Sequence, residues 1–495
     1  MSVRVEVMLK PDLDILIVAS EAAPLARTGG LGDATHNLAK YLRQIGHNPQ
    51  LIIPCYRGIQ QRFPCECIRS NIMVPISNRF EPVSIHRTFI ETDIPVFLVE
   101  KANYFDRSEL YGTEEGNYRD NSERFIFFSR AVPELIRHIG LTPDIVHCHD
   151  WQTALVPLYI RLNRETVQAF QSIRTVFTFH DLSYQGIFWC YDMQFTGLSW
   201  DYFRPDRLEF FGDLNLLKAG IIFSDALTTV SDAYCQAVQT QQHGQGLDGL
   251  LRARQNRFFG ISNGIDCDRW DPERDEMIQS NYSTEGRENK NRCRDHLAEV
   301  CRFSAHDSRL IAGVIGRLNQ PKGMDILARS IPDILARDLN LCILGIGETG
   351  IGRLIEESAS RFPGRVAFFN TIDESLAHQI LAGSDLFLMP SRFDPGGMSH
   401  LRAMRYGSVP IARSTFGLRD TIEDYDDRTR RGTGVLFDEA TPDAFLSAVD
   451  RAIRLFREPS HRSELIRQCM TRDVSGLTTA KQYEVIYSKL LSGVL

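Results

Sequence analysis

Short runs of β-branched and other apolar residues alternate with helical patterns along the chain, and this alternation limits the fold more than any other feature of the sequence. The runs fall at residues 15–19, 50–53, 144–147, 175–178 and 226–230, and again at residues 310–315, 341–344, 366–369, 386–389 and 409–412. Such alternation is typical of buried parallel strands with crossover helices. We therefore predict an α/β fold with two Rossmann-like, doubly wound sheets.

The length of the chain also favours two domains. Its 495 residues exceed the roughly 250–300 residues beyond which one hydrophobic core stops growing. We expect a first domain over residues 1–265, a second over residues 266–477, and a C-terminal helix over residues 478–495 that packs back on the first domain. The polar segment at residues 282–291 is expected on the surface. Because doubly wound sheets bind ligands beyond the carboxyl ends of their strands, we expect a site in a cleft between the domains.

Composition and charge exclude several classes of protein. The formal net charge of −7 provides no general attraction for nucleic acid or anionic membranes, so neither is expected as a partner. Residues 1–20 mix Arg4, Glu6 and Lys10 with short apolar runs and lack the core of a signal peptide, and no segment reaches about 18 uninterrupted apolar residues. We expect a cytoplasmic protein whose eleven scattered cysteines are mostly reduced and buried.

Three segments resemble cofactor motifs but do not predict a cofactor. The clusters Cys65–Cys67 and His147–His149 lack the ligand spacing of a zinc site, so no metal is expected. Gly345–Gly350 fits the G-x-G-x-x-G pattern of dinucleotide-binding loops. The apolar run Val366–Phe369 occupies the place where such loops require a ribose-binding acid, so we interpret the glycines as structural.

The glycine-rich segment Arg27–Asp33 follows the first predicted strand and precedes a helix with an apolar stripe at Ala34, Leu38, Leu42 and Ile45. Its cation, its glycines (among them Gly29 and Gly30) and a helix N-terminus that includes Asp33 are suited to bind phosphate. The alternative is a tight turn that binds nothing.

Histidines and aspartates follow two further predicted strands. His149 and Asp150 come after the run at residues 144–147, and His180 and Asp181 after the run at residues 175–178. Carboxyl ends of parallel strands meet at one edge of a sheet, so these titratable groups are candidates for chemistry. The alternative for each histidine is a structural role.

The second series of strands carries two further candidate loops. Arg317 and Lys322 lie five positions apart after one strand, where they are suited to bind a diphosphate leaving group. Asp394 follows another strand, with Gly397, Met398 and Ser399 at the expected start of a helix whose N–H groups can hold phosphate or sugar hydroxyls. The alternatives are a solvated basic loop and a turn with a helix cap.

In this order, the segments resemble the glycogen and starch synthases, a family of retaining glycosyltransferases, and the resemblance covers almost the whole chain. Further stretches with the family's pattern lie at residues 110–112, 118–121, 123–125, 215–220, 246–252 and 262–266. The resemblance implies two facing Rossmann-like domains of the GT-B type. It also implies transfer of glucose from ADP-glucose or UDP-glucose to the non-reducing end of an α-1,4-glucan, with retention and without a metal or cofactor.

The resemblance also implies roles for individual residues. His180 corresponds to a histidine near the donor sugar, Asp150 and Asn121 to acceptor-side residues, and Arg317 and Lys322 to the groups that bind the diphosphate. The remaining residues expected to bind substrate are Arg27, Gly29, Gly30, Asp33, Asn263, Thr371, Ile372, Gly397, Met398, Ser399 and Thr415, with Thr371 and Ile372 against the nucleoside. Asp394 is expected to help stabilise the positively charged sugar in the transition state.

Several site residues depart from the family's pattern. Asp394 replaces a glutamate, Arg27 a lysine, Asp181 an asparagine and Gly396 a cysteine, Ser399–His400 replaces Thr-Gln, and Phe416 stands where the family has a glycine. Two alternatives to an active synthase therefore stay open. One is a weakly active paralogue that binds glucan or regulates a partner, and the other is a related transferase with another donor or acceptor. The sequence leaves the oligomeric state open.

Overall fold

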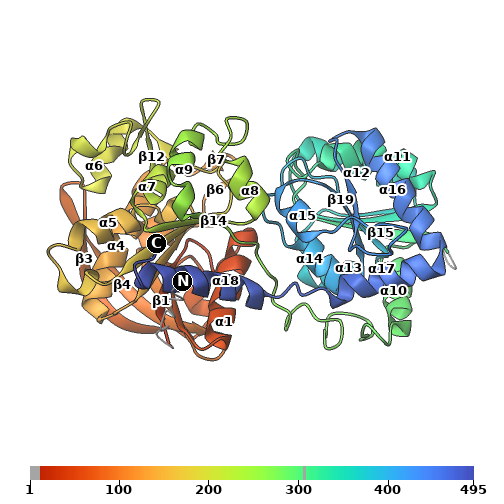
Figure 1. Cartoon of the computed structure of the whole chain (residues 1–495), viewed down its shortest axis with the longest axis horizontal. Helices are drawn as coiled ribbons and strands as arrows, with labels where there is room; N and C mark the ends of the chain where they lie inside the picture. The colour runs from red at the N-terminus through yellow and green to blue at the C-terminus, as the bar shows by residue number, and fades with distance from the viewer. Residues whose placement is uncertain (1–11, 305–307) are drawn as a thin grey trace, which may run out of the picture. The chain divides into compact units, whose positions relative to one another are not determined.

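The computed structural model describes residues 12–304 and 308–495, which form two compact units (Figure 1). Unit 1 comprises the described residues up to Ile261 together with Gly476–Leu495, and unit 2 comprises those within Ser262–Ser475. Arg4, Glu6 and Lys10, on which the expected lack of a signal peptide rests, lie outside the described residues. Within the described ranges, no helix has both the length and the apolar character needed to cross a bilayer.

Unit 1 is built on a nine-stranded sheet in the order β14-β13-β9-β8-β1-β2-β5-β4-β3. Its strands are β1 (Asp14–Val18), β2 (Asn48–Pro54), β3 (Glu66–Ile76), β4 (Arg79–Ile90), β5 (Ile94–Glu100), β8 (Ile145–His149), β9 (Arg174–Phe179), β13 (Ala226–Thr229) and β14 (Phe258–Gly260). The strands from β14 to β5 are parallel, and β4 and β3 add an antiparallel edge. From β1 the chain adds β2 and β5 on one side and later β8, β9 and β13 on the other. The strand order therefore reverses between β1 and β8.

The helices of unit 1 connect these strands, and the last of them returns from the C-terminus. They are α1 (Gly30–Gln44), α2 (Ile59–Arg62), α3 (Ala102–Phe105), α4 (Asn121–Ile139), α5 (Val156–Asn163), α6 (Met193–Thr196), α7 (Leu216–Phe223), α8 (Asp232–Ala237), α9 (Asp248–Ala253) and α18 (Gly476–Leu491). Short strands β10 (Ile187–Phe188), β11 (Glu209–Phe210) and β12 (Asp213–Asn215) form a separate small sheet, and β6 (Gly112–Thr113) pairs with β7 (Gly116–Asn117). Helix α18, dark blue in Figure 1, packs against α1, drawn in red.

Unit 2 contains a parallel six-stranded sheet in the order β17-β16-β15-β18-β19-β20. Its strands are β15 (Leu310–Ile315), β16 (Leu339–Leu344), β17 (Val366–Phe369), β18 (Leu386–Met389), β19 (Val409–Arg413) and β20 (Val435–Phe437). Its helices are α10 (Glu288–Val300), α11 (Met324–Leu335), α12 (Thr349–Arg361), α13 (Glu374–Gly383), α14 (Ser399–Arg405), α15 (Phe416–Thr421), α16 (Pro442–Arg457) and α17 (Pro459–Thr471). Here the strand order reverses between β15 and β18.

The structure confirms a strand at each of the ten predicted runs. Their central residues are buried almost throughout, as expected for strands covered on both faces. The sequence pattern did not predict the edge strands β3 and β4, the adjoining β5, or the short strands β14 and β20. In β3 and β4 exposed and buried positions are mixed, so neither forms a continuous apolar run.

The prediction that residues 282–291 lie on the surface fails at two positions. Tyr282 and Lys290 lie in the segment predicted to be on the surface, yet both are buried. The Lys290 ammonium donates to three backbone carbonyl oxygens, those of Ala382, Ser384 and Tyr406, at 2.8–3.0 Å. All three ammonium hydrogens therefore have acceptors, which permits burial of the charge.

A buried polar cluster in unit 2 joins α13 to the segment before α10. His378 Nδ1 lies 2.7 Å from Asp275 Oδ2, and the hydroxyl of Tyr406 donates to the same oxygen at 2.5 Å. The indole of Trp270 stacks on the His378 ring at 3.9 Å between centroids. Burial works against the charged imidazole, but the Asp275 and Glu374 carboxylates outweigh it and raise the pKa of His378. The hydrogen bonds from His378 and Tyr406 outweigh burial at Asp275 and lower its pKa.

We predict that His378→Ala lowers the free energy of unfolding by about 3 kcal/mol at pH 6, because it leaves the buried Asp275 carboxylate without its cation. The raised pKa means that the His378 contribution is complete below about pH 6.5 and is lost as pH rises through the folded-state value. Urea unfolding at pH 6 and pH 9 should therefore show a smaller loss at pH 9. His296→Ala, on α10 of the same unit, serves as the control, and an equal loss at both pH values would contradict the ion pair.

Candidate functional site

In unit 1 the loops that follow β1 and β8 leave the sheet where its strand order reverses. A crevice forms at such a point because the two loops diverge to opposite sides. The glycine segment Arg27–Asp33 lies in the connection from β1 to α1, and Asp150 directly follows β8. The sequence therefore placed both candidate groups at the position where doubly wound sheets bind ligands.

A buried carboxylate organises the glycine segment. Glu21, 3% exposed, accepts hydrogen bonds from the backbone N–H and hydroxyl of Thr28 at 2.7 and 2.8 Å, and from the Tyr111 hydroxyl at 2.7 Å. Arg27 forms an ion pair with Asp33 at 3.2 Å. Gly32 is required because a Cβ there would lie 2.9 Å from the carbonyl oxygen of Ala26. The segment is therefore held in one shape by the Arg27–Asp33 ion pair within it and by the buried Glu21 beside it.

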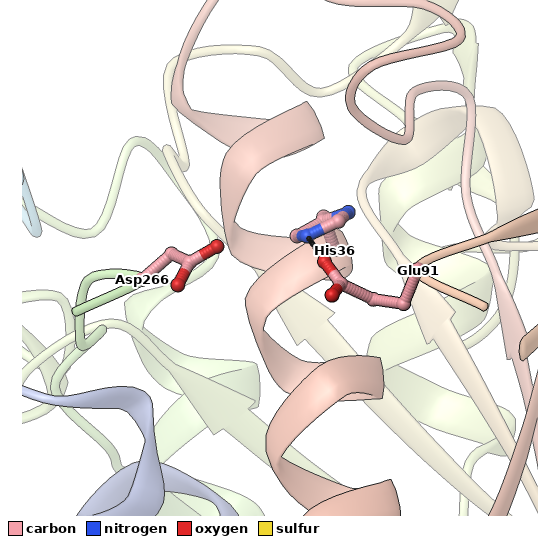
Figure 2. Close-up of side chains that lie close together, drawn as sticks. All are labelled: His36, Glu91 and Asp266. Atoms are coloured by element: carbon pink, nitrogen blue, oxygen red, sulfur yellow. Dashed lines mark ion pairs between the residues drawn. The ribbon is translucent and has the colours of Figure 1, made fainter. Parts of the chain in front are cut away.

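Helix α1 begins at Gly30, with Gly29 as an extended N-cap that makes no side-chain capping hydrogen bond. Figure 2 shows the imidazole of His36 on this helix turned toward the Glu91 carboxylate, with Nε2 at 2.9 Å from Oε1. The other ring nitrogen lies 2.8 Å from the carbonyl oxygen of Ala23, to which it donates. His36 thereby fixes α1 to the loop after β1. Asp266, also drawn in Figure 2, belongs to unit 2, where it accepts a hydrogen bond from the backbone of Asp268.

Three histidines form a row behind the loop that follows β8. His149 Nδ1 lies 3.2 Å from His180 Nε2, and the rings of His147 and His149 are 4.2 Å apart. His147 is held by the hydroxyls of Thr178 at 2.6 Å and of Tyr487, on α18, at 2.8 Å. Burial lowers the pKa of His147 to about 3, that of His180 to about 4, and that of His149 well below 6.5. His180 is therefore a neutral hydrogen-bonding group at pH 7.

Asp150 adopts a backbone conformation that favours glycine, with φ of 59°. Its Oδ1 accepts a hydrogen bond from the backbone N–H of His180 at 2.7 Å, and its own N–H donates to the carbonyl oxygen of Thr178. Burial raises the pKa of Asp150 to about 7, against the effect of the His180 N–H. Asp150 and His180 are thus brought together, and the carboxyl group can both accept and donate hydrogen bonds near neutral pH.

Asn121 is placed differently from the other candidates of unit 1. It is buried at the start of α4, where its amide donates to the carbonyl oxygen of Tyr111 and accepts a hydrogen bond from Arg124. Arg124 is wholly buried and also donates to the carbonyl oxygens of Tyr104 and Leu110. Both groups of the Asn121 amide therefore have partners within the protein, which gives the residue a structural role in shaping the loop before α4.

In unit 2 the loops that follow β15 and β18 are joined by an ion pair. Lys322 Nζ lies 2.8 Å from Asp394 Oδ2. Asp394 is 1% exposed, and its other oxygen accepts a hydrogen bond from the backbone N–H of Gly397 at 2.8 Å. A Cβ on Gly397 would lie 2.5 Å from the Asp394 carboxylate, so a larger residue there would displace the acid from this position. The expected cation and the expected acid are direct partners at the reversal of the sheet.

The remaining candidates of unit 2 surround this pair or lie at loop ends. Asn263 donates to the carbonyl oxygen of Gly396 at 3.3 Å, which ties it to the Asp394 loop. Met398 is a buried N-cap of α14, whose first residue is Ser399. Thr371 and Ile372 lie in the loop between β17 and α13, where Ile372 is 76% exposed and can pack on a planar ligand. Thr415 is the buried N-cap of α15.

The loop that carries Arg317 rests on the glycines of the G-x-G-x-x-G segment. A Cβ on Gly345 would lie 1.9 Å from the carbonyl oxygen of Gly316, and one on Gly347 would lie 2.3 Å from that of Leu318. Leu318 forms a β-bridge with Gly347, while Arg317 itself is exposed. Close packing of two loops therefore explains these glycines, as the structural interpretation of the segment predicted.

Phe416 has a φ of 38°, a conformation that favours glycine, and its ring contacts Phe393 edge-on at 5.2 Å. Beneath it, the buried His400 bonds through Nε2 to the Thr421 hydroxyl at 2.6 Å, and that hydroxyl donates to the carbonyl oxygen of Gly417. Burial lowers the pKa of His400 to about 4, so the ring is neutral. His400 therefore supports the turn that contains Phe416.

Sequence reasoning missed Glu21, His36 and the supporting role of His400. Each makes at least one contact with a residue distant along the chain, such as Tyr111 for Glu21. The signal for Glu21 was an acid at the end of an apolar run, where an unpaired charge is unfavourable.

We predict that Gly345→Ala destabilises the protein by about 1–3 kcal/mol, because the new methyl group would overlap the Gly316 carbonyl. Gly350→Ala is the matched control from the same motif. No atom lies within 4 Å of its Cβ position on α12, and alanine there should stabilise by up to about 1 kcal/mol. Thermal unfolding of both variants checks this, and equal midpoints would contradict the packing role of Gly345.

Two family models match the chain. The model described as the starch synthase catalytic domain covers residues 14–253, and the one described as glycosyl transferases group 1 covers residues 302–468. Glycogen synthase 2 of Geobacter sulfurreducens is 39% identical over 480 residues, which are 96% of this chain and 98% of the relative. Glycogen synthase of Thermodesulfovibrio yellowstonii is 36% identical over 493 residues, with 97% and 98% covered.

Among solved structures, the catalytic domain of starch synthase IV from Arabidopsis thaliana, bound to ADP and acarbose, matches with a TM-score of 0.91 and 34% identity. The match covers 97% of this chain and 100% of that one. Sucrose-phosphate synthase from Thermosynechococcus elongatus matches with a TM-score of 0.61 at 15% identity, a likeness of fold alone.

Proposed function

Because the chain belongs to the glycogen and starch synthase family of glycosyltransferases, we propose that it transfers glucose from ADP-glucose to the non-reducing end of an α-1,4-glucan with retention. A nucleotide sugar and a glucan are the substrates that family membership implies. The choice of ADP-glucose is supported by the similar starch synthase IV, whose structure was bound to ADP.

The observation that carries the proposal is the Lys322–Asp394 pair at the reversal of the unit 2 sheet. Departure of a nucleoside diphosphate generates negative charge, which fixed cations stabilise without a general acid. Lys322 is already oriented by a buried carboxylate, and Arg317 stands exposed on the adjacent segment of the same loop. We assign these two cations to the diphosphate, and the exposed Ile372 and its neighbour Thr371 to the nucleoside.

In unit 1 we assign Asp150 to the acceptor and His180 to the donor sugar. His180 is neutral, and Asp150 accepts its backbone N–H, so the positions of the two groups are coupled. Arg27, in its ion pair with Asp33, supplies a further cation for the donor. Asn121 contributes through the shape of its loop, because both groups of its amide have partners in the protein.

The proposed mechanism needs no covalent nucleophile. The departing phosphate oxygen takes the proton of the attacking acceptor hydroxyl on the same face of the sugar, which retains the anomeric configuration. As the bond to phosphate breaks, positive charge develops on the sugar ring and negative charge on the diphosphate. Asp394 orients Lys322 toward the latter, because its Oδ2 bonds the lysine. We assign the stabilisation of the former to the carboxylate charge of Asp394, as the resemblance to the family implies.

We further propose that the protein works in the cytoplasm. All eleven cysteines are free thiols, and most are buried. Free thiols are the rule in reducing compartments, whereas proteins of oxidising compartments commonly pair them in disulfides.

We predict that wild-type protein incorporates labelled glucose into glycogen from ADP-glucose faster than from UDP-glucose. Lys322→Ala should lower kcat/KM by about 10²–10³-fold, because one charge-stabilising group is lost from the transition state. Lys481→Ala, an exposed lysine on α18, is the control and should retain full activity. Absence of incorporation from either nucleotide would overturn the proposal and favour a glucan-binding or regulatory paralogue. Transfer only from another donor or to another acceptor would favour the related transferase.

A second variant tests the proposed role of Asp394. Asp394→Ala should lower kcat by about a hundredfold or more, since it removes a carboxylate from the reacting sugar and frees Lys322. Asp450→Ala, which breaks the ion pair of Asp450 with Arg337 in the same unit, is the matched control. Steady-state kinetics over a range of ADP-glucose concentrations separate kcat from KM. An unchanged kcat for Asp394→Ala would remove Asp394 from the mechanism while leaving the assignment of the donor intact.

A further inference from the structure

An exposed cluster of aromatic rings lies on unit 1, outside the groups assigned to the reaction. Trp189 is 64% exposed, Tyr191 55% and Trp200 52%, and we call these three residues the aromatic platform. The rings of Trp189 and Tyr191 lie 4.6 Å apart, and those of Tyr191 and Trp200 lie 6.0 Å apart. Two of the four tryptophans of the chain thus stay largely in water, where they contribute little to folding.

The chain segment that carries the platform is anchored to buried parts of unit 1. Met193 and Thr196 of α6, which lies between the platform residues in the sequence, are buried. The carbonyl oxygen of Thr196 accepts hydrogen bonds from the Tyr159 hydroxyl at 3.0 Å and from the Arg130 guanidinium. The Ser199 hydroxyl accepts from the Asp201 N–H and caps the short helix Trp200–Tyr202. The backbone that carries the exposed rings is therefore anchored by contacts that do not involve the rings.

The platform is continuous in sequence with the wall beside Asp150. Phe188, which precedes Trp189, packs its ring 5.4 Å from that of Trp151, the residue after Asp150. Gly186 lies against the same indole, since a Cβ there would be 2.6 Å from the ring. A ligand chain with one end at Asp150 would therefore reach the platform by extending past Trp151 and Phe188.

We propose that the aromatic platform binds an inner segment of the glucan chain, away from the end that receives glucose. Sugar rings carry apolar C–H faces that pack on aromatic side chains, while their hydroxyls bond polar groups at the edge. The exposed side chains of Gln194 and Asp201 supply such an edge. The ring plane of Tyr191 is inclined at 51° to that of Trp189 and at 72° to that of Trp200. Rings inclined in this way suit a curved α-linked chain better than a flat ligand. The identity of the ligand as α-glucan rests on the proposed function.

The test compares Trp189→Ala/Tyr191→Ala with Phe80→Ala, which removes a ring that is 66% exposed elsewhere on unit 1. Native gels containing glycogen measure binding without any need for transferase activity. We expect the double variant to bind glycogen about tenfold more weakly and Phe80→Ala to bind as wild type. Transfer to maltotriose should stay within about twofold of wild type, because the double variant leaves the groups assigned to the reaction unchanged.

Unchanged glycogen binding by the double variant would overturn the proposal, whether or not the protein transfers glucose. Loss of self-association on size-exclusion chromatography with glycogen binding intact would instead identify the platform as a protein interface. Trp200→Ala provides an independent variant if the double variant unfolds, and it should weaken glycogen binding in the same way. Absence of transfer by wild type together with platform-dependent glycogen binding would reject the synthase activity and keep the platform.

Discussion

The ion pair between Lys322 and Asp394 is the interaction on which the site of unit 2 depends. It joins two loops that are distant in sequence and meet only because β15 and β18 are parallel neighbours where the strand order reverses. Asp394 is almost wholly buried, and burial of a carboxylate is unfavourable unless a cation or hydrogen-bond donors replace the lost water. The local backbone follows from this requirement. Gly397 leaves room for the carboxylate, and Gly323, whose Cβ would lie 1.8 Å from the carbonyl oxygen of Pro390, brings the lysine loop close.

In unit 1 a different set of residues shapes the loops at the reversal of the strand order. Its reversal lies between β1 and β8, and the buried carboxylate there is Glu21, which accepts the backbone N–H of Thr28 much as Asp394 accepts that of Gly397. In both units a buried acid shapes the glycine loop that follows a strand. The histidine row of unit 1 is supported from behind by α18, since the Tyr487 hydroxyl bonds His147. The C-terminal helix therefore contributes to the geometry of His180 although it is last in the sequence.

The sequence predicted the parallel strands, the α/β fold class and the family, because strands buried on both faces form apolar runs and because site loops follow their carboxyl ends. Structure and comparisons confirm these predictions. The sequence did not predict the buried polar networks. In the sequence, Lys290 is one lysine in a polar segment. Only in the folded structure do three carbonyl oxygens from elsewhere in unit 2 surround its ammonium group. The sequence likewise does not indicate that Tyr487 is the residue of the C-terminal helix that reaches the buried His147.

The departures from the family's pattern in unit 2 are connected physically. Phe416 occupies a conformation that disfavours any residue with a Cβ, at a cost of about 1–3 kcal/mol. The turn that holds it is fixed by Thr421, whose hydroxyl links Gly417 to His400, another departure. Gly417 in turn approaches the Asp394 loop closely, since its Cβ position lies 2.5 Å from the carbonyl oxygen of Pro395. Asp394, His400 and Phe416 therefore belong to one packed cluster within unit 2. Reverting Phe416 to glycine alone would relieve the backbone strain but leave the shortened acid and its lysine partner as they are, so the altered residues are best understood as a set.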